Sequence, residues 1–133
     1  VEKKKAAFRG DEIAGKTLGV IGLGQIGVRL ANGGVHRYMK VRGFDPSPAL
    51  VNIHQLLPEV TICRSIRDTV ATADIVSLHL PLNNGTRGMV NREFITRMKK
   101  GTQGPKNILF TSWEHRKVCS CLRRYSPMSL PGL

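Results

Sequence analysis

Short apolar runs separated by turn residues recur along the first 100 residues, and their pattern predicts alternating strands and helices. Buried parallel strands read as unbroken apolar runs rather than as strict alternation. Such runs predict strands at 16–21, 41–44, 60–63 and 75–80, with a further edge strand at 107–110. Apolar residues at helical spacing predict helices at about 25–39, 49–57, 66–72 and 91–98. This alternation is typical of an α/β fold, a doubly wound parallel sheet with helices on both faces.

The first of these helices has a regular apolar face but a weak middle. Ile26, Leu30 and Val35 should point toward the sheet. Residues 32–34 are Asn-Gly-Gly, and each interior glycine costs roughly 1 kcal/mol relative to alanine. We therefore expect this helix to depend on packing rather than on intrinsic propensity.

Three glycines follow the first strand in G-x-G-x-x-G spacing. They are Gly22, Gly24 and Gly27, and the acidic residue Asp45 ends the next apolar run. The spacing alone is weak, because a chain with 14 glycines in 133 residues produces such patterns by chance. Its position between a strand and a helix, with an acidic residue after the second strand, predicts a partial Rossmann-type dinucleotide site.

Each glycine has a physical reason in such a site. Gly22 permits the tight turn out of the strand, Gly24 leaves room for a pyrophosphate, and Gly27 lets the helix lie close to the sheet. The phosphates would meet the amides and the positive dipole end of the helix that begins near Gln25.

Asp45 predicts the identity of the dinucleotide. Its carboxylate can accept hydrogen bonds from both hydroxyls of the adenine-side ribose and would repel a 2′-phosphate there. The prediction is NAD rather than NADP. The alternative is a glycine-rich turn without a ligand, in which Asp45 before Pro46 is a plain turn former.

The chain is strongly basic, with 21 Lys and Arg against 9 Asp and Glu and a net charge of +12. These charges are scattered and only 5% of residues are aromatic, so no basic stripe with interleaved aromatics indicates nucleic acid. No apolar run approaches the roughly 20 residues of a membrane span. The charged opening lacks the apolar middle of a signal peptide. We therefore expect a cytoplasmic protein with no nucleic-acid or membrane partner.

The three cysteines predict neither a disulfide framework nor a metal site. Cys63 lies in an apolar run and should be a core residue. Cys119 and Cys121 form a lone C-x-C without a second pair, which is weak for zinc.

Four ordered segments together resemble the cofactor domain of the D-isomer-specific 2-hydroxyacid dehydrogenases. They are residues 15–27, residues 43–46, residues 77–82 with Thr86, and residues 98–101. Within that family the chain is most similar to the phosphoglycerate dehydrogenase branch, which feeds serine biosynthesis. The resemblance implies a leading segment at 1–15, a partial dinucleotide-binding domain at 16–101, and an atypical tail at 102–133.

The resemblance also implies a set of cofactor-binding residues. Amides around Gln25 and Ile26 would hold the pyrophosphate, and Thr86 would lie beside the cofactor. The full set is Gly22, Gly24, Gln25, Ile26, Gly27, Asp45, Pro46, Leu80, Pro81 and Thr86. His79 ends a strand and is expected to be packed or next to the cofactor rather than catalytic.

The chain departs from the family in two places. Arg37-Tyr38 stands where family helices finish with a small residue and glycine, so the first helix must end differently. The family also places a strand after the position of Gly101, then Asn-x-x-Arg-Gly and later a catalytic glutamate and histidine. None of these motifs follows Gly101 here, so we assign no catalytic residue.

We interpret 102–133 as the product of a shifted reading frame or aberrant splice after about Gly104, with a diverged natural terminus as the alternative. The expected function is the NAD-binding portion of a 2-hydroxyacid dehydrogenase that transfers hydride between a 2-hydroxy acid and NAD, catalytically incomplete as it stands. The 2-hydroxy acid would bind only the full-length enzyme, which in this family can be a homodimer. The alternatives are a fragment acting on a glyoxylate- or lactate-type acid and a non-enzymatic, NAD-responsive interaction module.

Overall fold

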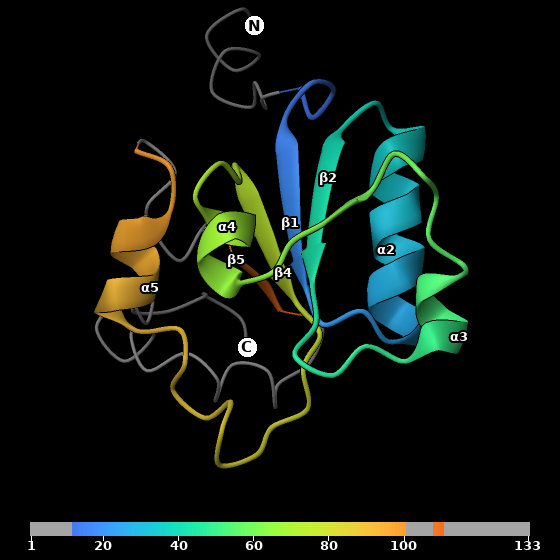
Figure 1. The fold of residues 1–133 in the computed structure, drawn as a ribbon. Helices are drawn as coiled ribbons and strands as arrows, with labels where there is room; N and C mark the ends of the chain where they lie inside the picture. Colours follow the sequence, from blue (N-terminus) through green and yellow to red (C-terminus); the bar gives the residue numbers. More distant parts are fainter. Residues whose placement is uncertain (1–11, 101–107, 111–133) are drawn as a thin grey trace, which may run out of the picture.

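A computed structural model describes residues 12–100 and the backbone of 108–110. One five-stranded parallel sheet runs in the order β3-β2-β1-β4-β5 (Figure 1). The strands are β1 (Thr17–Ile21), β2 (Lys40–Phe44), β3 (Thr61–Ile62), β4 (Ile75–Leu78) and β5 (Ile108–Phe110). The helices are α2 (Gln25–His36), α3 (Leu50–Ile53), α4 (Ile66–Val70) and α5 (Arg92–Arg97). The predicted doubly wound sheet is confirmed, and its order reverses between β1 and β4.

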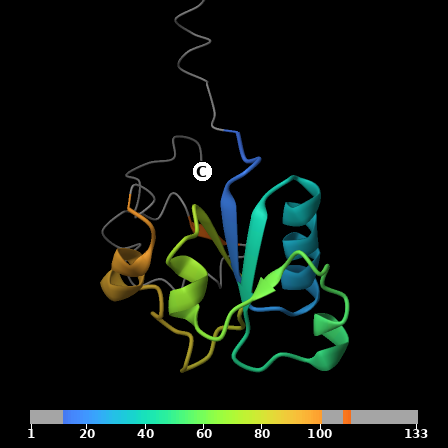
Figure 2. The ribbon, with the colours of Figure 1, turned by 45° about the horizontal axis from the view of Figure 1, so that its top comes forward.

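Helices cover both faces of this sheet. α2 and α3 lie on one side, and α4 and α5 lie on the other (Figure 2). Under α2, alternate residues of β1, Leu18 and Val20, point into one buried cluster. Its members are Leu18, Val20, Leu23, Val28, Ala31, Val41 and Val60. This burial is the main stabilising contribution on the α2 side.

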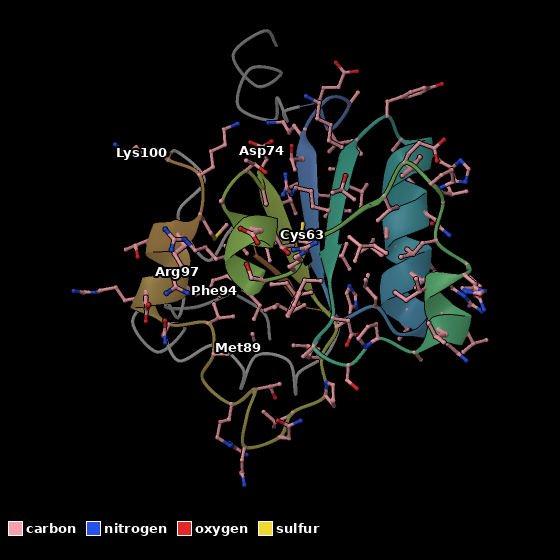
Figure 3. The ribbon with its side chains drawn as sticks, in the orientation of Figure 1. Cys63, Asp74, Met89, Phe94, Arg97 and Lys100 are labelled. Atoms are coloured by element: carbon pink, nitrogen blue, oxygen red, sulfur yellow. The ribbon has the colours of Figure 1, made fainter. Side chains whose placement is uncertain are left out.

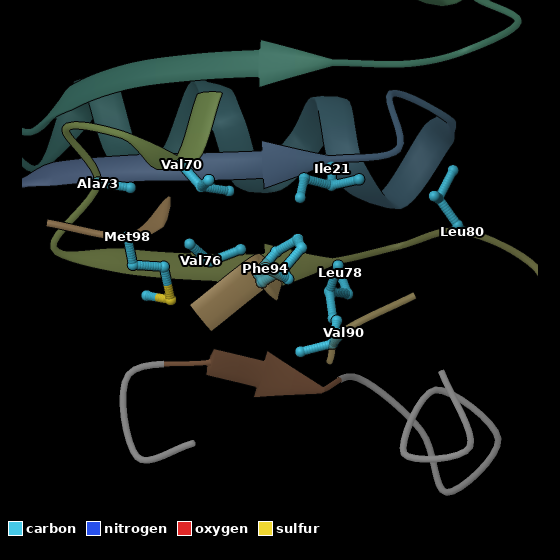
Figure 4. Close-up of a cluster of buried hydrophobic side chains, with 9 residues drawn as sticks. All are labelled: Ile21, Val70, Ala73, Val76, Leu78, Leu80, Val90, Phe94 and Met98. Carbon is cyan, nitrogen blue, oxygen red and sulfur yellow. The ribbon is translucent and has the colours of Figure 1, made fainter. Parts of the chain in front are cut away.

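A second cluster lies between the sheet and the helices α4 and α5. Ile21, the next residue of β1, points into this cluster because successive strand side chains alternate between faces. The cluster consists of Ile21, Val70, Ala73, Val76, Leu78, Leu80, Val90, Phe94 and Met98 (Figure 4). The predicted core position of Cys63 is also confirmed, because only 8% of the residue is exposed.

The glycines inside α2 allow the helix to lie close to the sheet. A Cβ atom added to Gly34 would lie 2.9 Å from Cγ2 of Val41 and 3.0 Å from Cδ2 of Leu18. The expectation that Ile26 faces the sheet is wrong, because 63% of that residue is exposed. The helix buries Gly27, Val28, Ala31 and Gly34 instead, so Ile26 lies outside the buried face.

The C-terminal end of α2 also differs from the prediction. The helix ends at His36, not near Met39, in a Schellman motif. Tyr38 N–H donates to the Val35 carbonyl at 3.0 Å, and Met39 N–H donates to the Gly34 carbonyl at 3.0 Å. Tyr38 adopts φ +61°, a left-handed conformation that favours glycine. The predicted departure at Arg37-Tyr38 is therefore a tyrosine in a glycine position.

Most of the other elements are shorter than predicted, and the side chain of Asn32 orders the chain after α3. The regular helix expected over 49–57 reaches only Ile53. Beyond it, Asn32 of α2 donates from Nδ2 to the Gln55 carbonyl at 2.8 Å and accepts from Leu57 N–H at 2.9 Å. One amide side chain therefore satisfies two backbone groups of a segment that lies in no helix or strand. Similarly, α4 stops at Val70 and β4 at Leu78 rather than at residues 72 and 80.

Several expectations fall on residues outside the described ranges. These are most of the leading segment, the Cys119–Cys121 pair, and the tail apart from β5. The edge strand predicted at 107–110 is confirmed as β5, which pairs in parallel with β4. Within the described residues, no helix combines the length and apolar character that a bilayer crossing requires.

Candidate functional site

The glycine turn lies at the carboxyl end of β1. Gly22 has φ +98°, and a Cβ atom there would approach the backbone carbonyl of His79 to 2.7 Å. The Gly22 N–H donates to the Phe44 carbonyl at 2.8 Å. The turn is thus enclosed by the ends of β2 and β4, and only glycine fits at this position.

The other two glycines of the motif have opposite surroundings. A Cβ atom on Gly27 would lie 1.9 Å from the carbonyl oxygen of Gly22, so helix and strand meet through their backbones. A Cβ atom on Gly24 would meet nothing within 4 Å. Gly27 is therefore needed for packing, whereas Gly24 has free space beside it. A pyrophosphate in that space would approach the backbone closely, so this geometry fits a dinucleotide.

The N-terminus of α2 has no side-chain cap, and neither does that of the short helix α3. Its N-cap residue, Gly24, makes no side-chain hydrogen bond, and no acidic residue stands in the first turn. By contrast, the N-termini of α4 and α5 are capped by Ser65 and Asn91. The first amides of a helix carry partial positive charge and need acceptors. The amides that begin at Gln25 are therefore suited to an anion.

The carboxylate of Asp45 lies directly against the glycine turn. Its Oδ2 accepts from the Leu23 N–H at 2.7 Å, and its Oδ1 accepts from the Ser47 N–H at 2.8 Å. The side chain is half-buried, and the following Pro46 is exposed. Each oxygen keeps lone pairs beyond the one that its amide uses. The orientation of the carboxylate is fixed, and it can still accept hydrogen bonds from a ribose.

The segment after β4 forms the third side of this region. Leu80 is buried in the core, with 6% exposed, and Pro81 is exposed. Thr86 Oγ1 donates to the Pro81 carbonyl at 2.6 Å and accepts from the Asn83 N–H at 2.9 Å. Asn83 Oδ1 in turn accepts from the Thr86 N–H at 3.0 Å. Thr86 therefore closes the loop, and its partner Asn83 was missed although the Asn-Asn-Gly-Thr sequence indicated a turn.

His79 stands between this loop and the glycine turn. Its backbone N–H donates to the Ile21 carbonyl at 2.7 Å, and Nε2 of its half-buried ring lies 2.8 Å from Oγ of the buried Ser77. The ring is held against its own strand. We assign it no catalytic role.

The letters Asn-x-x-Arg-Gly do occur once, at Asn84–Gly88, but in a different place from the family motif. They lie in the turn between β4 and α5, where Gly88 has φ +68° and Arg87 is exposed. The family motif follows a later strand. We therefore do not assign these residues to substrate binding.

The structure brings the predicted residues together at one edge of the sheet. The glycine turn contacts Asp45 through Leu23 and contacts the end of β4 through the backbone of His79. This edge is the switch point between β1 and β4, where doubly wound folds bind ligands. Two side chains of the predicted set do not face this edge as ligand-binding groups. The side chain of Leu80 is in the core, and the hydroxyl of Thr86 donates to the Pro81 carbonyl of its own loop.

Comparison with known proteins identifies this arrangement. Residues 2–103 match the family model described as D-isomer specific 2-hydroxyacid dehydrogenase, NAD binding domain. The chain belongs to this family. NAD is therefore the cofactor of the domain, in agreement with the prediction from Asp45.

Curated relatives from this family include D-3-phosphoglycerate dehydrogenase of Mycobacterium leprae. It is 39% identical over 102 residues, which are 74% of this chain and 18% of the relative. The hydroxypyruvate reductase of Thermotoga maritima is 36% identical over 99 residues, which are 74% of this chain and 30% of the relative. The phosphoglycerate dehydrogenase name recurs among the relatives. The chain thus spans less than a third of the length of these curated relatives.

Solved structures agree with this assignment. The D-isomer specific 2-hydroxyacid dehydrogenase of Lactobacillus delbrueckii ssp. bulgaricus, in its NAD complexed form, matches with a TM-score of 0.58 and 29% identity. The match covers 70% of this chain and 27% of the other. The shared part is the cofactor domain.

Proposed function

We propose that residues 16–101 are the NAD-binding half-site of a D-3-phosphoglycerate dehydrogenase. The observation that carries this proposal is the joint geometry of an open Gly24, an uncapped α2 N-terminus and a fixed Asp45 carboxylate at one edge of the sheet. The recurring phosphoglycerate dehydrogenase name among the relatives supports the substrate class. The buried free thiol of Cys63 is compatible with a reducing, cytoplasmic setting.

The residues would divide the work of holding the cofactor. The amides of Gln25 and Ile26 would bind the pyrophosphate at the start of α2. Asp45, followed by Pro46, would accept hydrogen bonds from the ribose hydroxyls. The exposed Pro81 and the loop closed by Thr86 would border the cofactor on the side of β4. When bound, NAD accepts or donates the hydride, and the protein supplies position and exclusion of the 2′-phosphate.

Phosphoglycerate oxidation needs groups beyond this half-site. The family uses an arginine to bind the substrate carboxylate and a glutamate–histidine pair to move the proton. We propose that the 133-residue chain binds NAD but does not turn over D-3-phosphoglycerate by itself. The check is NADH formation with purified chain, NAD and D-3-phosphoglycerate, where we expect none above background. Measurable turnover would refute the claim of incompleteness.

A second substrate class is favoured by a specific relative. The hydroxypyruvate reductase from Thermotoga maritima is nearly as similar to this chain as the phosphoglycerate dehydrogenases. The cofactor half-site has the same task in both enzymes. If turnover is found, comparing D-3-phosphoglycerate with D-glycerate distinguishes the two, because only the former carries a phosphate.

The cofactor site is best tested at Gly24. Gly24→Ser places a side chain in the space proposed for the pyrophosphate, and serine is a preferred N-cap residue. Gly24 has φ −79° and ψ −168°, which serine adopts without strain. We expect the substitution to raise the free energy of unfolding by about 0.5 kcal/mol and to weaken NAD binding at least tenfold. The measurements are urea unfolding and isothermal titration with NAD.

The opposite signs of the two effects make this experiment decisive. A loss of NAD affinity caused by unfolding would be accompanied by reduced stability. Gly33→Ser is the matched control, because Gly33 is on the same helix, away from its N-terminus. It should leave NAD affinity unchanged. If Gly24→Ser also leaves NAD affinity unchanged, the pyrophosphate does not lie at this turn and the proposed site is wrong.

A further inference from the structure

A basic residue, Arg64, follows β3 at the carboxyl end of the sheet, as Asp45 follows β2. β2 and β3 pair in parallel, with Gly43 opposite Ile62. Cys63 extends this pairing, because its N–H donates to the Gly43 carbonyl at 2.7 Å. The same register carried onward sets Arg64 alongside Asp45. The two charged residues therefore lie at neighbouring strand ends on the edge where the ribose is proposed to bind.

The backbone of Arg64 is held on both sides, while its side chain is exposed. Cys63 before it is fixed by its hydrogen bond to Gly43 and is buried (Figure 3). Ser65 after it caps α4, and its Oγ accepts from the Asp68 N–H at 3.1 Å. No hydrogen bond or ion pair joins the Arg64 side chain to another described residue. The backbone from which the Arg64 side chain extends is therefore held in place. No described carboxylate forms an ion pair with its guanidinium.

We propose that Arg64 is a second determinant of cofactor specificity, opposed to Asp45. The carboxylate of Asp45 rejects a 2′-phosphate by charge repulsion. A guanidinium binds phosphate in a bidentate manner, and an arginine near this ribose is how related sites accommodate NADP. Arg64 therefore supplies the cation that would hold a 2′-phosphate once the carboxylate is neutral. The inference rests on the proposed NAD site, at which the Asp45 carboxylate would oppose a 2′-phosphate and Arg64 would favour it.

The test is a double-mutant cycle on the 133-residue chain, with NAD and NADP titrated separately into each variant. Asp45→Asn removes the charge and keeps the shape, but its single oxygen can accept from only one of the two amides, that of Leu23 or that of Ser47. We expect it to strengthen NADP binding roughly tenfold, the effect of one charge-assisted phosphate contact. Adding Arg64→Ala should abolish that gain. Adding Arg67→Ala instead is the matched control and should preserve it, because Arg67 is another exposed arginine, within α4.

Salt dependence provides a second readout. NADP binding by Asp45→Asn should weaken more steeply with added NaCl than NAD binding does, because the new contact joins two charges. An equal NADP gain with and without Arg64 would overturn the proposal. So would a gain that Arg67→Ala removes as fully as Arg64→Ala. If the unmodified chain binds neither dinucleotide, it is the proposed NAD site itself that fails, so the two failures are distinguishable.

Discussion

An aspartate stands at each end of the central strand β1, and the two carboxylates are compensated differently. At the amino end, Asp74 accepts from the Thr17 N–H at 2.9 Å and from Nζ of Lys99 at 3.0 Å. At the carboxyl end, Asp45 accepts only from neutral backbone amides among the described residues. The carboxylate of Asp74, which joins separate elements, is paired with a lysine. The carboxylate of Asp45, where the cofactor is proposed to bind, has no such ion pair among the described residues and can still accept hydrogen bonds from a ligand.

The two ends also differ in what brings the elements together. The carboxyl end depends on backbone atoms in direct contact, at Gly22 and Gly27, whereas the amino end depends on side chains that reach across. Asp74 and Lys100, both labelled in Figure 3, lie toward the same end of the molecule. This difference predicts that the carboxyl end tolerates less change in shape and the amino end less change in charge.

The largest expected effect is that of Gly27→Ala. The added methyl would lie 1.9 Å from the Gly22 carbonyl oxygen, so the backbone must move. We expect the free energy of unfolding to fall by roughly 3 kcal/mol, measured by urea unfolding. Gly24→Ala is the control, because a Cβ atom there has no neighbour within 4 Å. Its free energy of unfolding should fall much less. Equal losses for the two variants would show that the carboxyl end does not depend on this contact.

The next effect belongs to Asp74→Asn. The asparagine keeps an acceptor for Thr17 but loses the ion pair with Lys99, so we expect a loss of about 1.5 kcal/mol. NAD affinity should stay unchanged, because Asp74 is at the opposite end of β1 from the glycine turn. Unfolding and NAD titration together check this. A drop in NAD affinity without a drop in stability would contradict the assignment of separate roles to the two aspartates.

The same carboxylate predicts a pH dependence. The pKa of Asp74 lies below its ordinary value, chiefly because the Thr17 N–H donates to it and also because of Lys99, while burial opposes the shift. A carboxyl whose pKa is lower in the folded state stabilises the fold above its unfolded pKa, about 3.9. That contribution is lost as the pH falls from there through the folded pKa. Asp74→Asn should flatten this part of the stability profile, measured by urea unfolding between about pH 2 and pH 6.

The smallest effect is a gain at Tyr38. Its φ of +61° costs a non-glycine residue about 1 kcal/mol, and 83% of the residue is exposed, so little packing would be lost. Tyr38→Gly should therefore raise the free energy of unfolding by about 0.5 to 1 kcal/mol. Thermal unfolding checks this, with Arg37→Gly as a control that should not stabilise. A destabilised Tyr38→Gly chain would mean that the tyrosine ring contributes packing at this end.

The sequence predicted the strands and the contact of Asp45 with the glycine turn better than the details of the helices. Apolar runs located the strands, and the position of Asp45 after β2 correctly indicated contact with the turn after β1, since neighbouring parallel strands end at one edge. Ile26 was misplaced because helical spacing of large apolar residues does not show that small residues, Gly27, Ala31 and Gly34, form much of the buried face. The end of α2 was missed because Tyr38 takes a conformation that tyrosine rarely adopts. Local sequence patterns do not reveal which helix face is buried or where a helix ends, because tertiary contacts decide both.

The amide of Asn32 acts as a substitute peptide group. Like a backbone unit, it combines N–H donors with a carbonyl acceptor, and it uses one of each on residues 23 and 25 positions away. The segment around Gln55 thereby obtains the pairing that an adjoining strand would otherwise provide. Isosteric replacement by leucine or aspartate would leave at least one of these groups unsatisfied. Asn32 has a low helix propensity, yet its side chain orders the irregular segment that lies beside α2.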